Sequence, residues 1–154
     1  MIDTTHIHPM IVHFPIALLI VGFLFDVTGM FVRKEFFSWA GFSLLMLGAL
    51  GVIAAFVSGN LAGSGITEEG VLKQALETHE SAAELTVWIT GFAALFRLAL
   101  VLLKKYKGYL KIAALVIYLA AVAAIGRTGF YGGELVYKHA AGVKLDLGFD
   151  FNGE

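Results

Sequence analysis

Residues 9–31 read PMIVHFPIALLIVGFLFDVTGMF, an apolar run in which only His13 and Asp26 can carry a charge. A helix of that length crosses the roughly 30 Å of bilayer hydrocarbon at about 1.5 Å per residue. Comparable runs lie at about residues 37–62, 79–103 and 109–130. The sequence therefore predicts an all-α fold, a bundle of four transmembrane helices forming a single integral membrane domain over residues 1–154.

Composition supports a membrane protein and excludes several other classes. Hydrophobic residues make up 58% of the 154 residues and charged residues only 15%, whereas about a quarter of a soluble domain is charged. The runs are apolar at consecutive positions, unlike the alternating strands of a membrane barrel. With no cysteine and a net charge of −1, the chain offers no disulfide, thiolate-bound cluster or covalent c-type haem, and no basic surface for nucleic acid.

The basic residues predict the orientation. Most of them lie in the connection after the first span, or at the end of the third span and just beyond it: Arg33, Lys34, Arg97, Lys104, Lys105, Lys107 and Lys111. The positive-inside rule makes that side cytoplasmic, so both termini are expected outside. No Lys or Arg precedes Arg33, so the first span is expected to be a retained helix, because a signal peptide has a basic start.

Small residues recur at helical spacing in two spans and predict close helix packing. In the second span they are Gly41, Gly48, Gly51, Ala55, Gly59 and Ala62, and in the fourth Ala113, Ala114, Ala120, Ala121 and Ala124.

All the histidines fall at or near the predicted outer side: His6, His8, His13, His79 and His139. Ionisable groups in a bilayer are costly, so they usually face the bundle interior and serve a function. Imidazoles from facing helices are how a bundle holds b-type haem. His13 and His79 are the favoured axial pair because both lie at similar shallow depth, and His8 with His139 would form a second pair. Arg127 is the expected cation for the haem propionates.

Other interpretations of the same residues stay open. A non-haem copper, iron or zinc ion would use the same four histidines, with Glu84 as a further candidate ligand. In a structural anchor subunit, the histidines would only form hydrogen bonds. His79 could simply follow a helix start capped by Thr78. Several further polar or glycine positions could mark ordinary helix ends or interfaces: Asp26, Asn60, Arg97, Gly126, Gly129, Gly132 and Gly133.

The tail over residues 140–154 is predicted to lie outside the membrane. Apolar and polar residues alternate between Val143 and Phe151, which indicates an extended strand. Such a strand could dock on a partner by strand addition, or the segment could be a frayed terminus.

Two motifs resemble a family of bacterial four-helix membrane proteins of unknown function. The first is HIHPMIVHFPIAL at residues 6–18, and the second is GGELVYKH at residues 132–139. The position of His79 at the third span also fits, so the resemblance covers essentially the whole chain. Ala140 departs from the family, which usually has glycine after the last histidine.

The resemblance implies an electron-transfer role in the bacterial cytoplasmic (inner) membrane. Members occur beside Rieske or cytochrome c domains, or fused to them, which implies an outer-face electron-transfer protein or membrane complex as partner besides the lipid bilayer. The matching ligands are His8, His13, His79 and His139. The expectation is a cytochrome b-like subunit with haem b near the outer face, and whether it is an enzyme on its own stays open. With ligands on one side only, this chain alone is not expected to relay electrons across the membrane.

Overall fold

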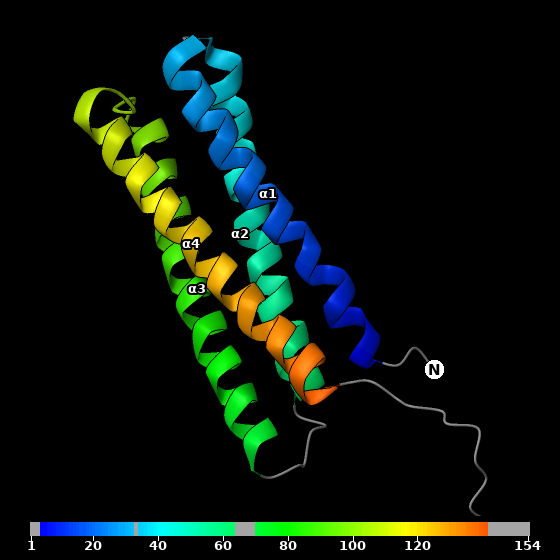
Figure 1. Cartoon of the computed structure of the whole chain (residues 1–154). Helices are drawn as coiled ribbons and strands as arrows, with labels where there is room; N and C mark the ends of the chain where they lie inside the picture. The colour runs from blue at the N-terminus through cyan, green and yellow to red at the C-terminus, as the bar shows by residue number, and fades with distance from the viewer. Residues whose placement is uncertain (1–3, 33, 64–69, 142–154) are drawn as a thin grey trace, which may run out of the picture.

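The computed structural model describes residues 4–32, 34–63 and 70–141, with side chains from His8 onward. Its helices are α1 (Thr4–Val32), α2 (Glu35–Gly63), α3 (Val71–Leu102) and α4 (Gly108–His139) (Figure 1). Each is long and apolar enough to cross a membrane. The prediction of four helical spans is confirmed, and no strand occurs within the described ranges. The tail strand predicted after Val143 lies outside those ranges.

Two helices extend further than the hydropathy indicated. α3 begins at Val71, so Thr78 is no helix cap; its hydroxyl donates within the helix to the Gln74 carbonyl at 2.8 Å. α4 continues through Gly132 and Gly133 to His139, so the interpretation of these glycines as a helix end is wrong. The additional turns of both helices are richer in polar residues, which is why an apolar-run criterion stops short of them.

The helices form two hairpins, α1 with α2 and α3 with α4 (Figure 1). Each helix contacts its two neighbours around a ring, and the backbones of the diagonal pair α1 and α3 do not approach one another in the described part of the chain. Any contact between α1 and α3 must therefore be made by side chains that reach across the bundle interior.

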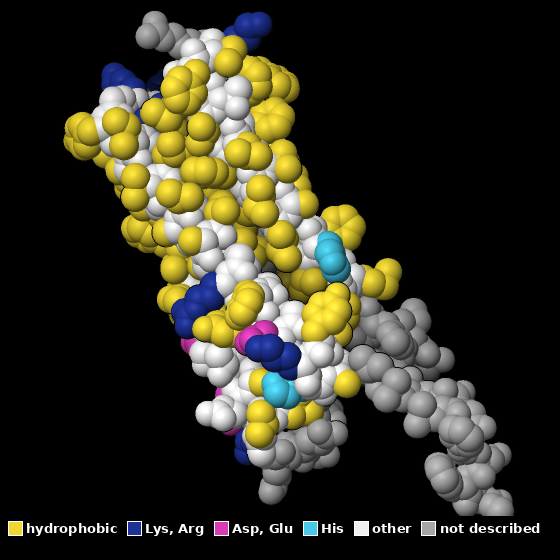
Figure 2. Space-filling view, viewed as in Figure 1, with side chains coloured by type: hydrophobic (Ala, Val, Ile, Leu, Met, Phe, Trp, Pro, Cys, Tyr) yellow, Lys and Arg dark blue, Asp and Glu magenta, His cyan; other side chains and the backbone are white. Residues whose placement is uncertain are grey.

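The buried core is small, as expected for a bundle that faces lipid. It centres on Leu19, Leu45, Tyr118 and Ala121. Many large apolar side chains point outward instead, including Trp88 at 71% exposure. Figure 2 shows apolar side chains over the middle of the molecule and charged ones toward its two ends. This distribution matches a helix bundle that contacts the hydrocarbon of a bilayer.

Glycines of α2 bring it close to α1. Gly41 and Gly48 are buried, and a Cβ at Gly48 would lie 2.7 Å from Leu19. A Cβ at Gly51 would lie 3.2 Å from Pro15. The predicted packing role of the small residues in this span is confirmed.

The end of α4 explains why Ala140 is an unusual choice. Ala140 has a φ of 50° in the left-handed region, and its N–H donates to the Val136 carbonyl. Glycine adopts this conformation without the clash that a Cβ produces. Ala140 therefore caps this helix at the position where the resemblance implies glycine.

Candidate functional site

His8 and His79 meet inside the bundle. Their ring centroids lie 6.4 Å apart, with an angle of 75° between the ring planes. His8 belongs to α1 and His79 to α3, the diagonal pair whose backbones do not pack together. The two imidazoles therefore reach across the interior, at the end of the bundle away from the short connections before α2 and α4.

The His8 ring is held by α2. Its Nδ1 lies 3.0 Å from the Ser58 hydroxyl oxygen, and that hydroxyl donates its own proton to the Ala55 carbonyl at 3.0 Å. With the Ser58 proton in that bond, His8 Nδ1 is the donor in this contact. The Nε2 atom of the neutral ring then carries a free lone pair.

The His79 ring is held by α4 in the same way. Its Nδ1 lies 3.2 Å from the Thr128 carbonyl oxygen, and a carbonyl can only accept, so Nδ1 again donates. The Thr128 hydroxyl donates to Ala124 and lies 2.9 Å from the hydroxyl of buried Thr86. This arrangement fixes the ring and leaves Nε2 free to bind a ligand. Ligating histidines in metal sites are commonly oriented by such a bond from the other ring nitrogen.

Each imidazole lies against a glycine of the helix that holds it. A Cβ at Gly59 would lie 2.9 Å from His8 Cε1, and one at Gly132 would lie 3.1 Å from His79 Cε1. Both distances are too short for a side chain at either position without displacing the ring. Gly59 was predicted to serve helix packing only, but in the structure it makes room for an imidazole.

The other predicted ligands lie apart from this pair. His13 is exposed, and its Nδ1 donates to the Pro9 carbonyl of its own helix at 2.7 Å. His139 is the half-buried last residue of α4, and its ring has no hydrogen-bond partner among the described residues. The contacts thus join His79 to His8 rather than to His13, the predicted partner. Exposed Arg127 places its guanidinium 5.3 Å from the centroid of the Tyr131 ring, one turn further along α4.

Helix periodicity explains why His8 and not His13 faces inward. His13 follows His8 by five residues, which places it about 140° around an α-helix from His8. His8 shares its face with the buried positions of α1: Pro15, Leu19, Gly22, Asp26 and Gly29. Depth in the membrane does not distinguish His8 from His13, whereas the spacing to these small and apolar positions identifies His8 as the inward ring.

Acidic side chains line a pocket of about 260 Å³ made by α2 and α3, with Glu77, Glu80 and Glu84 beside Asn60. Within the described ranges no three His, Asp or Glu side chains are close enough together to hold a metal ion. The predicted non-haem ligand set, the four histidines with Glu84, is therefore not brought together in this part of the chain.

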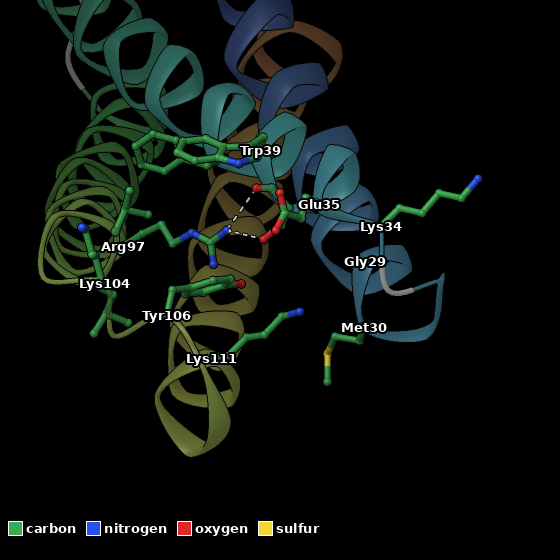
Figure 3. Close-up of a pocket in the computed structure, with 13 residues that line it drawn as sticks. Gly29, Met30, Lys34, Glu35, Trp39, Arg97, Lys104, Tyr106 and Lys111 are labelled. Atoms are coloured by element: carbon green, nitrogen blue, oxygen red, sulfur yellow. Dashed lines mark hydrogen bonds between the residues drawn. The ribbon is translucent and has the colours of Figure 1, made fainter.

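A larger pocket of about 560 Å³ lies at the opposite end, beside the short connections (Figure 3). Arg97 of α3 lines it, together with Trp39 of α2 and Tyr106 of the connection before α4. The Arg97 side chain is 3% exposed and so is that of Asp26, and the two form an ion pair with 3.2 Å between Nη2 and Oδ1.

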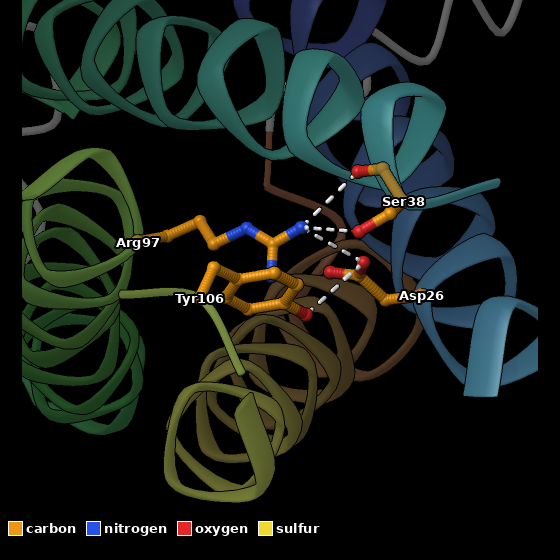
Figure 4. A network of polar contacts seen from close by, with 4 residues as sticks. All are labelled: Asp26, Ser38, Arg97 and Tyr106. Carbon is orange, nitrogen blue, oxygen red and sulfur yellow. Dashed lines mark hydrogen bonds and ion pairs between the residues drawn. The ribbon is translucent and has the colours of Figure 1, made fainter. Parts of the chain in front are cut away.

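Further contacts complete a network around Arg97 (Figure 4). Arg97 Nη2 lies 3.1 Å from both the carbonyl and the hydroxyl oxygen of Ser38. The Tyr106 hydroxyl donates to Asp26 Oδ1 at 3.4 Å. The interpretation of Asp26 and Arg97 as markers of ordinary helix ends or interfaces is wrong, because both are buried and paired across the bundle. Gly41 makes room for the carboxylate, since a Cβ there would lie 2.7 Å from Asp26 Cγ.

The fold defines a class: a multi-pass membrane protein built as a four-helix bundle with a histidine pair in its interior. The family model of the predicted membrane proteins of DUF2231 matches residues 4–145. The chain therefore belongs to that family, and the resemblance seen in the two sequence motifs is confirmed. No curated protein and no solved structure matches the chain.

Proposed function

We propose that this protein is a b-type cytochrome-like electron-transfer subunit in which His8 and His79 are the axial ligands of one haem. The observation that carries the proposal is the interior pair of imidazoles, each anchored through Nδ1 to a neighbouring helix. A bis-histidine haem needs two such nitrogens from facing helices. Bound haem would supply one-electron chemistry, and the protein would supply its ligation, burial and orientation.

The separation of the two rings fits coordination to one metal. Two imidazoles bound through Nε2 on opposite sides of one metal place their centroids roughly 6.5 Å apart, because each metal–nitrogen bond is about 2.0–2.1 Å and each centroid lies about 1.2 Å behind its nitrogen. The observed separation is 6.4 Å. The rings also come from the two hairpins, which contact one another less extensively than the helices within each hairpin do. A flat cofactor between the hairpins would disturb the smaller of these interfaces.

The donor set also favours haem over a bare ion. Haem brings four ligands of its own, so two imidazoles complete it, whereas zinc sites in proteins use three or four protein ligands. Two imidazoles are what the described residues bring together. Arg127, exposed on α4 next to the Thr128 that holds His79, is the cation we assign to the propionates. A non-haem copper or iron ion on the same pair is the second candidate.

The site lies at one end of the bundle, which limits the electron transfer it can perform. The positive-inside rule predicts that this end lies outside the cytoplasm. At about 1.5 Å per residue, Arg97 at the other end lies about 27 Å away along α3. We therefore propose electron exchange with an outer-face protein or another subunit of a membrane complex. The proposed site does not include the other two predicted ligands, His13 and His139.

Absorption spectra of the purified protein test the proposal. The full chain, expressed with adequate haem supply and purified in detergent, is expected to show a Soret band that shifts on dithionite reduction, with one haem per chain. His8→Ala and His79→Ala should each remove most of this absorption. His13→Ala is the matched control, because the same substitution on the same helix changes an exposed ring.

Three outcomes would contradict the assignment. Full haem content in both His8→Ala and His79→Ala would exclude this ligand pair. A wild-type protein that binds no haem, even when haem is added, would exclude the cofactor. Loss of haem in His13→Ala with retention in His8→Ala would support His13 and His79 as the axial pair instead. Stoichiometric copper or iron in a colourless protein would support the second candidate.

A further inference from the structure

The pocket beside the short connections contains a buried cation whose hydrogen bonds are not all used. Arg97 is 2% exposed, and within the described part of the chain its Nε and Nη1 atoms have no hydrogen-bond partner. Buried N–H groups in native proteins nearly always have an acceptor. Arg97 lines the pocket (Figure 3), and the acceptor oxygens of a bound molecule would reach these two buried atoms once the Tyr106 ring, stacked on the guanidinium, moves aside.

Positive charge is in excess around this pocket. The Tyr106 ring has the Arg97 guanidinium carbon 3.0 Å from its centroid and the Lys111 ammonium 5.7 Å from it. Two further lysines line the pocket, Lys34 and Lys104. The acids among the lining residues and their ion pairs are Glu35 and Asp26. Four cations and two carboxylates thus border this pocket, with the Lys34 side chain directed away from the others (Figure 3), and an anion would balance the remaining positive charge.

The apolar part of the lining indicates what kind of anion fits. Trp39, 56% exposed, and Met30, 37% exposed, line the same pocket together with Phe42. Exposed tryptophan near the end of a membrane span is typical of the headgroup level of a bilayer. A ligand that suits both parts has a phosphate for the cations and hydrocarbon for the aromatic wall.

We propose that this pocket binds the headgroup of one anionic phospholipid. The phosphate lies among Lys104, Lys111 and Arg97, and the acyl chains leave along the Trp39 side into the bilayer. Arginine and lysine are the side chains that bind phosphate oxygens. Basic pockets between transmembrane helices on the cytoplasmic side are typical sites for acidic lipid headgroups, and the basic connections predict that this end is cytoplasmic. The site is independent of the histidine pair.

Lipid titration of the purified full chain tests this proposal. The protein is stripped of lipid in an uncharged detergent and titrated with phosphatidylglycerol or with phosphatidylcholine of the same acyl chains. Native mass spectrometry counts bound lipid, and tryptophan fluorescence follows thermal unfolding. We expect one tightly retained phosphatidylglycerol, with phosphatidylcholine binding at least about tenfold more weakly, because its headgroup carries no net charge.

Lysine variants separate the pocket from general surface charge. Lys104→Gln/Lys111→Gln should weaken phosphatidylglycerol binding about tenfold or more. Lys105→Gln/Lys107→Gln is the matched control, because it removes the same charge from the same end of the molecule at positions that do not line the pocket. None of these side chains is buried, so both double variants should fold.

The outcomes are clear-cut. Equal binding of the two lipids, or equal losses in the two double variants, would overturn the proposal. If inorganic phosphate alone stabilised the protein against heat as much as phosphatidylglycerol does, the pocket would be a site for a soluble anion, and the lipid assignment would be overturned. Selective retention of phosphatidylglycerol that depends on Lys104 and Lys111 would support it.

Discussion

His79 and Arg97 lie on the same face of α3, about five helical turns apart, and each reaches across the bundle to a side chain of α1. Their partners, His8 and Asp26, have the same spacing on α1. The bundle interior therefore has a polar centre at each end, with the apolar core around Leu19 between them. The proposed haem site uses one centre and the proposed lipid site the other, so substitutions at one end should leave the other unchanged.

Glycine 132 is expected to be essential for the position of the His79 ring. In Gly132→Ala the new Cβ would lie 3.1 Å from His79 Cε1, so the imidazole must move. If His79 is an axial ligand, haem content per chain should fall several-fold, as measured by the absorption of the reduced protein. Gly59→Ala should act likewise on His8, where the corresponding distance is 2.9 Å.

The neighbouring glycine provides the control. A Cβ at Gly133 would have no neighbour within 4 Å, so Gly133→Ala makes the same chemical change on the same helix without touching a ring. It should retain wild-type haem content. Equal haem content in Gly132→Ala and Gly133→Ala would show that the close approach of Gly132 to the His79 ring has no effect on cofactor binding.

Breaking the ion pair at the other end should destabilise the fold strongly. Arg97→Gln leaves the Asp26 carboxylate, 3% exposed, without its cation. Removing one partner of a buried ion pair typically costs about 3–5 kcal/mol in the free energy of unfolding. Thermal unfolding, followed by the fluorescence of Trp39 and Trp88, would measure the loss.

The double variant Asp26→Leu/Arg97→Met tests whether the loss comes from the unpaired charge. Replacing both members of a buried pair with apolar residues of similar size is often neutral, so this variant should be more stable than Arg97→Gln. A double variant that is less stable than the single one would show that the contacts of Arg97 with Ser38 and Tyr106 matter more than the ion pair.

Much of the fold, but less of the site, follows from the sequence. Long apolar runs predict the spans, because backbone groups in a bilayer must bond within a helix. Asp26 and Arg97 could not be paired in advance, since nothing in a single chain shows which residues of α1 and α3 meet across the interior. Helical periodicity does predict the inward position of His8, because His8 lies on the same helix face as Pro15 and Leu19.

Replacing Ala140 with glycine should stabilise the end of α4. Ala140 has a φ of 50°, and the left-handed conformation costs a residue with a Cβ about 1–2 kcal/mol. Part of that gain is offset by the greater chain entropy of glycine in the unfolded state, so a net gain of about 1 kcal/mol is expected. Slower amide hydrogen exchange in the last turn of α4 would report it. Ala141→Gly is the control, because Ala141 has no positive φ, and a gain there as large as at Ala140 would refute the explanation.

Overpacking the interface between α1 and α2 should destabilise the bundle. A Cβ at Gly48 would lie 2.7 Å from the side chain of Leu19, a fully buried residue, so Gly48→Ala must displace that side chain or the helices, at a cost of about 1–3 kcal/mol. Gly91→Ala is the matched control, because a Cβ there meets nothing within 4 Å, and alanine favours a helix by about 1 kcal/mol over glycine. The midpoint temperature of thermal unfolding in detergent should therefore fall for Gly48→Ala and stay level or rise for Gly91→Ala. Equal midpoints for the two variants would mean that close approach of α2 to Leu19 contributes nothing to the stability of the bundle.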